Sequence, residues 1–193
     1  MTSGYAPAWT GTGALVPDRT SVRIYTFAEG LFAAFAHDLE LRVEQLRGLA
    51  EYGPHSLVQM EAPVSGIRVA GVMRKGSVDT AVLTQSDRRE INRKIQREVF
   101  RGMASLNIRA DFDGQTARLM ISQPSGSAVF PVENFSMRED KDLIGVSGES
   151  TLCLKTMCIR EIGALLGAFR ISNRVVVRFD AVFEKYSIAG HNK

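Results

Sequence analysis

The residues of this sequence best suited to chemistry are His37 and Asp38, which interrupt the mostly apolar run FAAFAHDLEL at 32–41. An imidazole beside a carboxylate is an arrangement that acid–base catalysis uses. In the longer run LFAAFAHDLELRV at 31–43, however, the odd positions are apolar apart from His37, and the charged residues fall on even positions. Because side chains alternate along a strand, we expect His37 to face inward and Asp38 outward. This separation argues against a His–Asp catalytic pair.

An inward-facing histidine leaves several interpretations open. The imidazole of His37 can be neutral and bonded to the backbone or to another side chain, or it can contact the polar head of a bound ligand. Metal ligation and acid–base catalysis remain as further alternatives. The other histidines are His55 and His191, and neither lies in a cluster of ligating residues. We therefore expect no metal site.

Other motifs of catalysis and cofactor binding are absent from the sequence. It contains no GxSxG elbow, and no Walker loop or GxGxxG segment follows a strand and opens a helix. The two cysteines, Cys153 and Cys158, are too few for a disulfide framework or a zinc site. We expect both to act as small buried or half-buried apolar residues. No catalytic residue and no cofactor is predicted, apart from a bound lipid.

The composition is that of one globular domain. The chain has 193 residues, 45% of them hydrophobic and 23% charged, with a net charge of +3. Basic residues are scattered, so nucleic-acid binding is not expected. We find no signal-peptide pattern and no apolar run long enough to span a membrane, and we expect a cytoplasmic protein. Residues 1–20 are predicted to be a flexible arm, 21–187 the domain and 188–193 a tail.

Period-two patterning dominates the domain and predicts strands. Alternating residues at 104–113 and 115–122 flank Asp113–Gly114, which is typical of a hairpin turn. In the run 174–184, the odd positions from Val175 to Phe183 share one apolar face. Further strands are predicted at 22–28, 56–62, 67–72, 78–83, 127–132 and 142–154.

One helix is expected within SDRREINRKIQREVF at 86–100, with Asp87 as its N-cap. Ile91, Ile95 and Val99 make a narrow apolar stripe, and the other faces are rich in arginine and lysine. That basic surface is either a solvated face or a contact for phosphate head groups. A second short helix is predicted at 159–168. Many strands and few helices predict a mainly β protein, an antiparallel sandwich or barrel.

Four segments together resemble the YceI-like family of bacterial lipid-binding barrels, and the similarity extends over about residues 22–186. They are GLFAAFAHDLEL at 30–41, DRREINRKIQREVFRGMASLNIRADF at 87–112, VSGESTLCLKTMCI at 146–159 and LLGAFRISNRVVVRFDAVFE at 165–184. The chain departs from the family where CLKTMC replaces a His-Gly-Val-Thr-Lys-Pro stretch, and it lacks the family's usual secretion signal. The chain therefore resembles a divergent member of this family.

The resemblance implies an eight-stranded antiparallel barrel of lipocalin type, whose lumen holds one elongated apolar molecule such as an isoprenoid, an isoprenoid quinone or a fatty-acid derivative. It also implies a possible homodimer. The residues expected to bind the ligand share apolar strand faces, with His37 meeting the polar end: Phe35, His37, Leu39, Leu41, Leu106, Ile108, Phe112, Val177, Phe179 and Phe183. The alternative is a filled barrel, a stress-related scaffold that acts through protein–protein contacts.

Overall fold

The computed structural model describes residues 10–29, 37–124, 126–159, 163–164 and 169–186 of the chain. These residues form a closed antiparallel barrel with eight walls and one α-helix, which confirms the predicted fold class. Three walls each consist of two consecutive strands: β1 (Gly11–Leu15) with β2 (Ser21–Glu29), β3 (Leu39–Val43) with β4 (Arg47–Tyr52), and β5 (Ser56–Pro63) with β6 (Ile67–Arg74). The other five are β8 (Ser105–Phe112), β9 (Ala117–Gln123), β10 (Gly126–Glu139), β11 (Leu143–Cys153) and β13 (Phe169–Tyr186).

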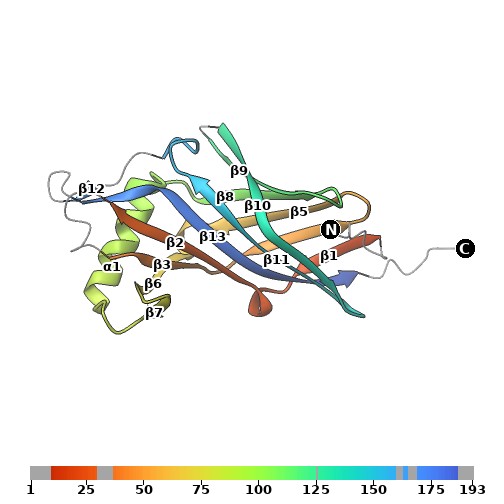
Figure 1. Cartoon of the computed structure of the whole chain (residues 1–193), viewed down its shortest axis with the longest axis horizontal. Helices are drawn as coiled ribbons and strands as arrows, with labels where there is room; N and C mark the ends of the chain where they lie inside the picture. Colours follow the sequence, from red (N-terminus) through yellow and green to blue (C-terminus); the bar gives the residue numbers. More distant parts are fainter. Residues whose placement is uncertain (1–9, 30–36, 125, 160–162, 165–168, 187–193) are drawn as a thin grey trace, which may run out of the picture.

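Each wall pairs with its neighbour in the chain, and β1 closes the ring. Strand β1 pairs with β4 on one side and with the C-terminal end of β13 on the other. Strand β2 pairs with an earlier part of β13, so the long last strand spans both halves of the first wall. Figure 1 shows β13 running along most of the length of the barrel. Closure leaves the middle of the barrel without a free strand edge.

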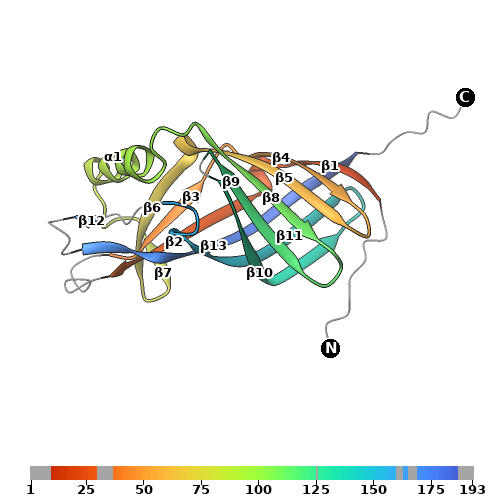
Figure 2. The same ribbon diagram turned by 90° about the horizontal axis from the view of Figure 1, so that it is seen from above.

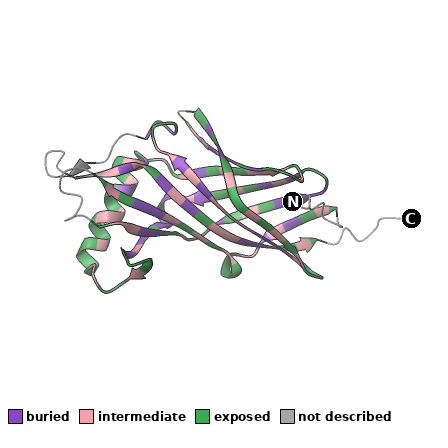
Figure 3. Ribbon diagram, viewed as in Figure 1, coloured by how far each residue is buried: buried purple, intermediate pink, exposed green. Residues whose placement is uncertain are grey.

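Inward and outward residues alternate along the walls, as the sequence predicts. The hairpin of β8 and β9 pairs Phe112 with Ala117, and its turn contains Asp113 and Gly114. Gly114 has a φ of 89°, a conformation that glycine adopts without a steric penalty. Figure 3 shows buried or intermediate residues interleaved with exposed ones along the strands. The predicted hairpin and the strand at 174–184 are thus confirmed.

Helix α1 (Gln85–Lys94) crosses one end of the barrel and continues into the π-helical turn η4 (Ile95–Val99). Figures 1 and 2 place α1 near β6 and β7 (Ser77–Asp79), at the end opposite β1. Its N-cap is Thr84, three residues before the predicted cap Asp87. Asp87 is the third helical residue and completes a capping box, because its carboxylate accepts the Thr84 backbone N–H at 2.9 Å.

The helix substitutes for a missing strand partner of β6. Strand β8 pairs with β5, and β7 pairs only with residues 72–74 of β6, so the same edge of β6 has no strand against it at Val69 and Ala70. The Asn92 side-chain oxygen accepts the backbone N–H of Val69 at 2.9 Å. The Arg88 guanidinium donates to the backbone oxygens of Val69 at 3.2 Å and Ala70 at 2.7 Å. At this end, side chains therefore provide the hydrogen bonds that a neighbouring strand provides elsewhere.

Several sequence-based boundaries are wrong. Strand β1 lies inside the predicted flexible arm, where glycines hide any strand pattern; a Cβ on Gly13 would lie 2.8 Å from the Glu184 carbonyl oxygen. Strand β4 was not predicted, and the strand predicted at 78–83 ends at Asp79. The second helix predicted at 159–168 is also wrong where the structure describes it, because Gly163 and Ala164 form strand β12, which pairs with β13. The rest of 160–168 lies outside the described residues.

No helix among the described residues has the length and apolar character needed to cross a membrane.

Candidate ligand-binding site

An elongated cavity of about 170 Å³ occupies the barrel interior. A single water needs about 10–15 Å³ of such space, so the cavity exceeds the room of one or two waters many times over. Residues from all eight walls line it, and the apolar ones in the strands are Val22, Ile24, Leu41, Val43, Val58, Met60, Ala62, Ile67, Leu106, Ile108, Ala110, Phe112, Ala117, Leu119, Ile121, Val132, Phe135, Met137, Val146, Leu152, Ile171, Val175, Val177, Phe179 and Ala181.

Several inward residues that line this cavity keep accessible surface although they face the interior. Ile108, Ala110 and Phe112 on β8 are only half-buried, and so is Phe179 on β13. The cavity and these half-buried inward side chains together show that the barrel is not packed solid with its own residues.

Polar groups are scarce along the lining, and two of them are engaged by other groups of the protein. The polar lining residues are Thr26, Tyr52, Ser56 and Asp111. The Ser56 hydroxyl donates to the Gly53 carbonyl at 3.1 Å, and the Asp111 carboxylate is ion-paired with Arg109 at 3.0 Å. The Tyr52 phenol is neutral at physiological pH, and burial raises its pKa further above the ordinary range. The surface offered to a ligand is therefore almost wholly apolar and uncharged.

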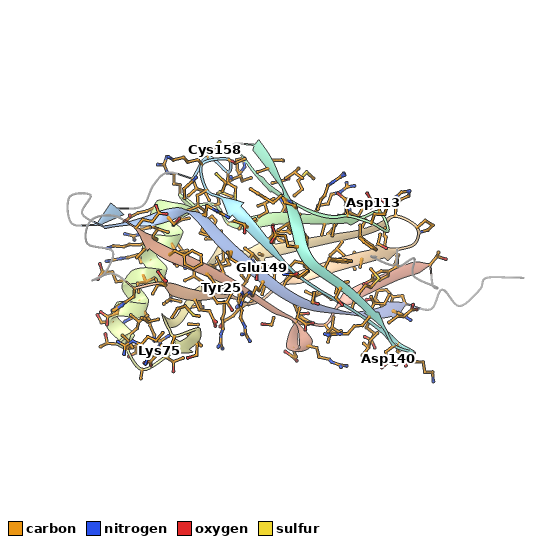
Figure 4. All side chains as sticks on the ribbon, in the orientation of Figure 1. Tyr25, Lys75, Asp113, Asp140, Glu149 and Cys158 are labelled. Carbon is orange, nitrogen blue, oxygen red and sulfur yellow. The ribbon has the colours of Figure 1, made fainter. Side chains whose placement is uncertain are left out.

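The two ends of the cavity are covered by different elements, and we call the end nearest β1 the hairpin end. It carries the connections between β4 and β5, β8 and β9, and β10 and β11; Figure 4 labels Asp113 and Asp140 there. Phe183 and Ile144 are fully buried at this end, and the Tyr52 ring meets Phe183 edge-on at a centroid distance of 6.2 Å. These close-packed residues, together with the β1 pairings, close the side of the hairpin end that lies next to β1, whereas Phe112 beside the β8–β9 turn lines the cavity and is only half-buried.

The other end, which we call the helix end, is covered by α1, η4 and the turn at 154–159. Ile95, Val99 and Phe100 line the cavity from the helical segment. Leu154 and Ile159 line it from the turn, where the Ile159 N–H donates to the Leu154 carbonyl at 2.9 Å. That hydrogen bond closes a six-residue turn from Leu154 to Ile159. Cys158, the next-to-last residue of the turn, has the positive φ of 54° that such a turn requires there. The cover of the helix end is thus made of a helix and a turn, not of paired strands.

Six of the predicted ligand-binding residues line this cavity. They are Leu41, Leu106, Ile108, Phe112, Val177 and Phe179. Leu39 and Phe183 do not belong to the lining; Phe183 is fully buried in the packing of the hairpin end. Phe35 lies outside the described residues. The period-two pattern identified the correct face, but it could not tell which inward residues meet space and which meet one another.

The predicted orientation of His37 is wrong. His37 is exposed, precedes β3 and is not among the lining residues. Strand β3 begins only at Leu39, so the alternation extrapolated from the apolar run does not extend to His37. The half-buried Asp38 accepts the backbone N–H of Ala28 at 2.9 Å and has a structural role. His37 and Asp38 therefore form no inward polar site in the lumen.

The sequence did not predict that residues of the helix line the lumen. Ile95 and Val99 belong to the apolar stripe read from the sequence, but the stripe did not reveal that it faces a lumen. Phe135 was also missed, because it lies beyond the strand predicted at 127–132, in the charged run ENFSMREDKD at 133–142. Strand β10 in fact extends to Glu139, and the Phe135 ring lies 4.5 Å from that of Phe112.

Neither cysteine is fully buried, and no metal-binding group is found within the described ranges. Cys153 is half-buried and Cys158 is exposed. Hydrogen bonds from Thr156, and a further one from the Asn173 amide to Sγ at 3.1 Å, lower the pKa of Cys153 to about 7. No group of three or more His, Cys, Asp or Glu residues suited to a metal ion occurs in the part of the chain that the structure describes.

Comparison with known proteins gives matches in structure but not in sequence. No protein-family model and no curated protein matches the chain. A solved polyisoprenoid binding domain from Saccharophagus degradans, implicated in plant cell wall breakdown, is similar with a TM-score of 0.62 and 9% identity, covering 92% of this chain and 100% of that one. BcnA from Burkholderia cenocepacia is similar with a TM-score of 0.56 and 9% identity, covering 87% and 98%. The resemblance to YceI-like barrels is thereby confirmed at the level of the fold.

Proposed function

We propose that this protein binds and carries one elongated apolar molecule in the barrel lumen, and that the molecule is an isoprenoid, an isoprenoid quinone or a fatty-acid derivative. The observation that carries the proposal is the continuous apolar lining of the cavity between the hairpin end and the helix end. A likeness in fold to a polyisoprenoid binding domain supports the same class of ligand.

The physical chemistry of the lining favours a flexible hydrocarbon chain. Removing apolar surface from water contributes roughly 25 cal/mol per Å² buried, and a polyprenyl or acyl chain has little else to offer. Water gains few hydrogen bonds in a lumen with so few polar lining residues, and apolar cavities of this order bind apolar molecules. Residues from both ends of the barrel line the space, which suits one extended chain better than a bulky ring system. A polar head group then lies at an end of the lumen.

The filled-barrel scaffold receives no specific support. That function requires a large exposed apolar patch. The most exposed large apolar residues on the outer walls are Leu49 and Val129, at 59% and 57% exposure. They stand at opposite ends of one row of paired residues that crosses β4, β5, β8, β9 and β10. Arg109 lies between them in that row. Binding without catalysis is the simplest function for the lumen.

The experiment combines extraction with a displacement assay. Protein purified without detergent is extracted with organic solvent, and the extract is analysed by mass spectrometry. In parallel, a fluorescent farnesyl or fatty-acid probe is titrated into delipidated protein. We expect a co-purifying long-chain lipid and saturable probe binding at one site per chain.

Two variants on β8 make the assay specific for the lumen. Ala110→Phe fills space at the cavity wall, and we expect it to abolish probe binding. Asn107→Phe adds the same ring to an exposed position of the same strand and should leave binding intact. Absence of any extracted lipid together with no probe uptake, or equal binding by both variants, would contradict the proposal.

A further inference from the structure

The helix end carries a stripe of arginines on the surface that faces away from the barrel. Arg89, Arg93 and Arg97 recur at intervals of four residues along α1 and η4, and all three are exposed. Residues four apart lie above one another on one helix face. We call these three residues the arginine stripe. Arg101, also exposed, follows it immediately in the chain.

The arginine stripe is not engaged by the acidic residues of its own segment. Lys94 pairs with Glu90 at 3.3 Å, and Asp87 is used in the capping box. Glu98 is the remaining acidic residue of the segment. Within the described ranges no ion pair involves a residue of the arginine stripe.

Arg88 shows by contrast what a structural arginine does on this helix. It is half-buried and donates to the backbone oxygens of Val69, Ala70 and Thr80. The stripe residues make no such contacts with the described part of the chain. Their charges are therefore not needed to hold the helix on β6, and they remain accessible to a partner.

The opposite side of the same segment lines the lumen. Ile95 and Val99 contact the cavity, while Arg93 and Arg97 alternate with them along the helix and are exposed. One short segment thus joins a cationic outer surface to the cover of an apolar cavity. The hairpin end, in contrast, is closed beside β1 by paired strands and by the packing of Phe183.

We propose that the arginine stripe docks the helix end onto an anionic lipid bilayer, so that the covered mouth of the lumen faces the membrane from which the ligand is taken or to which it is delivered. This inference rests on the proposed function, since a membrane is where a long apolar ligand resides. Lipid phosphates complement the three guanidinium groups, and each basic residue near an anionic surface strengthens binding.

The test is sedimentation of the full chain with large unilamellar vesicles, either of phosphatidylcholine alone or with 30 mol% phosphatidylglycerol, at low and at physiological salt. We expect binding only to the phosphatidylglycerol vesicles, weakened by salt. Replacing Arg89, Arg93 and Arg97 together by Gln should weaken that binding on the order of 100-fold.

A charge-matched control separates docking from general attraction. Replacing Arg19, Arg47 and Arg118 by Gln removes the same total charge from exposed positions outside the helix. This control should retain most of the vesicle binding. Equal losses in both triple variants, or no vesicle binding by the unaltered chain, would overturn the proposal; in the latter case the stripe would be left to an acidic protein or to solvent.

Failure of docking is distinguishable from failure of the proposed function. The stripe variant is titrated with the soluble fluorescent probe in the absence of vesicles, and circular dichroism establishes that it is folded. Unchanged probe binding with lost vesicle binding supports docking at the arginine stripe. Vesicle binding by a chain that takes up no probe and carries no lipid would leave a membrane-binding barrel and would overturn the link between docking and ligand transfer.

Discussion

The two ends of the barrel are closed in physically different ways. At the hairpin end, β1 is hydrogen-bonded to β4 and β13, and Phe183 and Ile144 are fully buried beneath it. At the helix end, the cover consists of α1, η4 and a turn, attached to β6 through the side chains of Arg88 and Asn92. Separating the helix from β6 breaks a few side-chain hydrogen bonds and uncovers Ile95 and Phe100, whereas opening the hairpin end beside β1 disrupts strand ladders. We therefore expect ligands to enter and leave through the helix end.

Truncating aromatic residues on β13 tests most directly whether the hairpin end is more tightly packed than the lumen. Phe183→Ala should lower the free energy of unfolding by about 3–5 kcal/mol, because it removes a fully buried ring. Phe179→Ala, on the same strand and facing the lumen, should cost about half as much because its ring already borders space. Urea unfolding followed by circular dichroism measures both. Equal losses would show that the lumen is as tightly packed as the hairpin end.

The attachment of the helix is tested by Arg88→Gln. We expect a loss of about 1.5–3 kcal/mol in the free energy of unfolding, because charged hydrogen bonds to three backbone oxygens are removed. Arg89→Gln changes an exposed neighbour and should stay within about 0.5 kcal/mol of the unaltered chain. Arg88→Gln should also speed probe release in stopped-flow fluorescence. Unchanged release with reduced stability would argue against entry at the helix end.

The β8–β9 turn at the hairpin end is expected to lose stability at acid pH. Hydrogen bonds from the backbone N–H groups of Thr116 and Gln115 lower the pKa of Asp113 to about 2. The folded pKa lies below the unfolded value of about 3.9, so the stabilisation is present above about pH 4 and is lost as the pH falls toward 2. Asp113→Asn should flatten the pH dependence of the urea midpoint in this window. An identical slope in the variant would show that the hairpin does not depend on the ionised carboxylate.

The smallest expected effect concerns the turn at the helix end. With a pKa of about 7, the Cys153 thiol should react with iodoacetamide with a midpoint near pH 7 in a Cys158→Ser background. Thr156→Val removes the principal hydrogen bond to the thiolate and should move the midpoint upward. Mass spectrometry of the alkylated peptide follows the reaction. A midpoint unaffected by Thr156→Val would show that the turn is not ordered around Cys153 in solution.

Local pattern was sufficient for much of the barrel. The alternation at 104–113 and 174–184 predicted β8 and β13 and the inward positions of Ile108, Val177 and Phe179, because a strand with one buried face must alternate. Strand β1 was missed because Gly11 and Gly13 give no such pattern, and only pairing with β4 and β13 makes it a strand. Pairing of distant segments leaves no local signal to read.

The site was harder to predict than the fold. An apolar inward residue looks the same in a packed core and beside a cavity, so Phe183 and Phe179 carry the same sequence signal with different roles. His37 misled because the apolar run before it suggested a longer strand than β3. The helical lining at Ile95 depends on how α1 attaches to β6 through Asn92, a long-range contact that the helix pattern does not encode.

The most direct test of a ligand-filled lumen is a crystal structure of the protein with a polyprenyl or acyl chain that carries bromine at its apolar end. We predict one anomalous peak inside the barrel, among the residues that line the cavity around Ile108 and Phe179. Continuous density should lead from that peak toward the helix end. A lumen without a peak, or bromine bound only on the outer walls, would contradict the account.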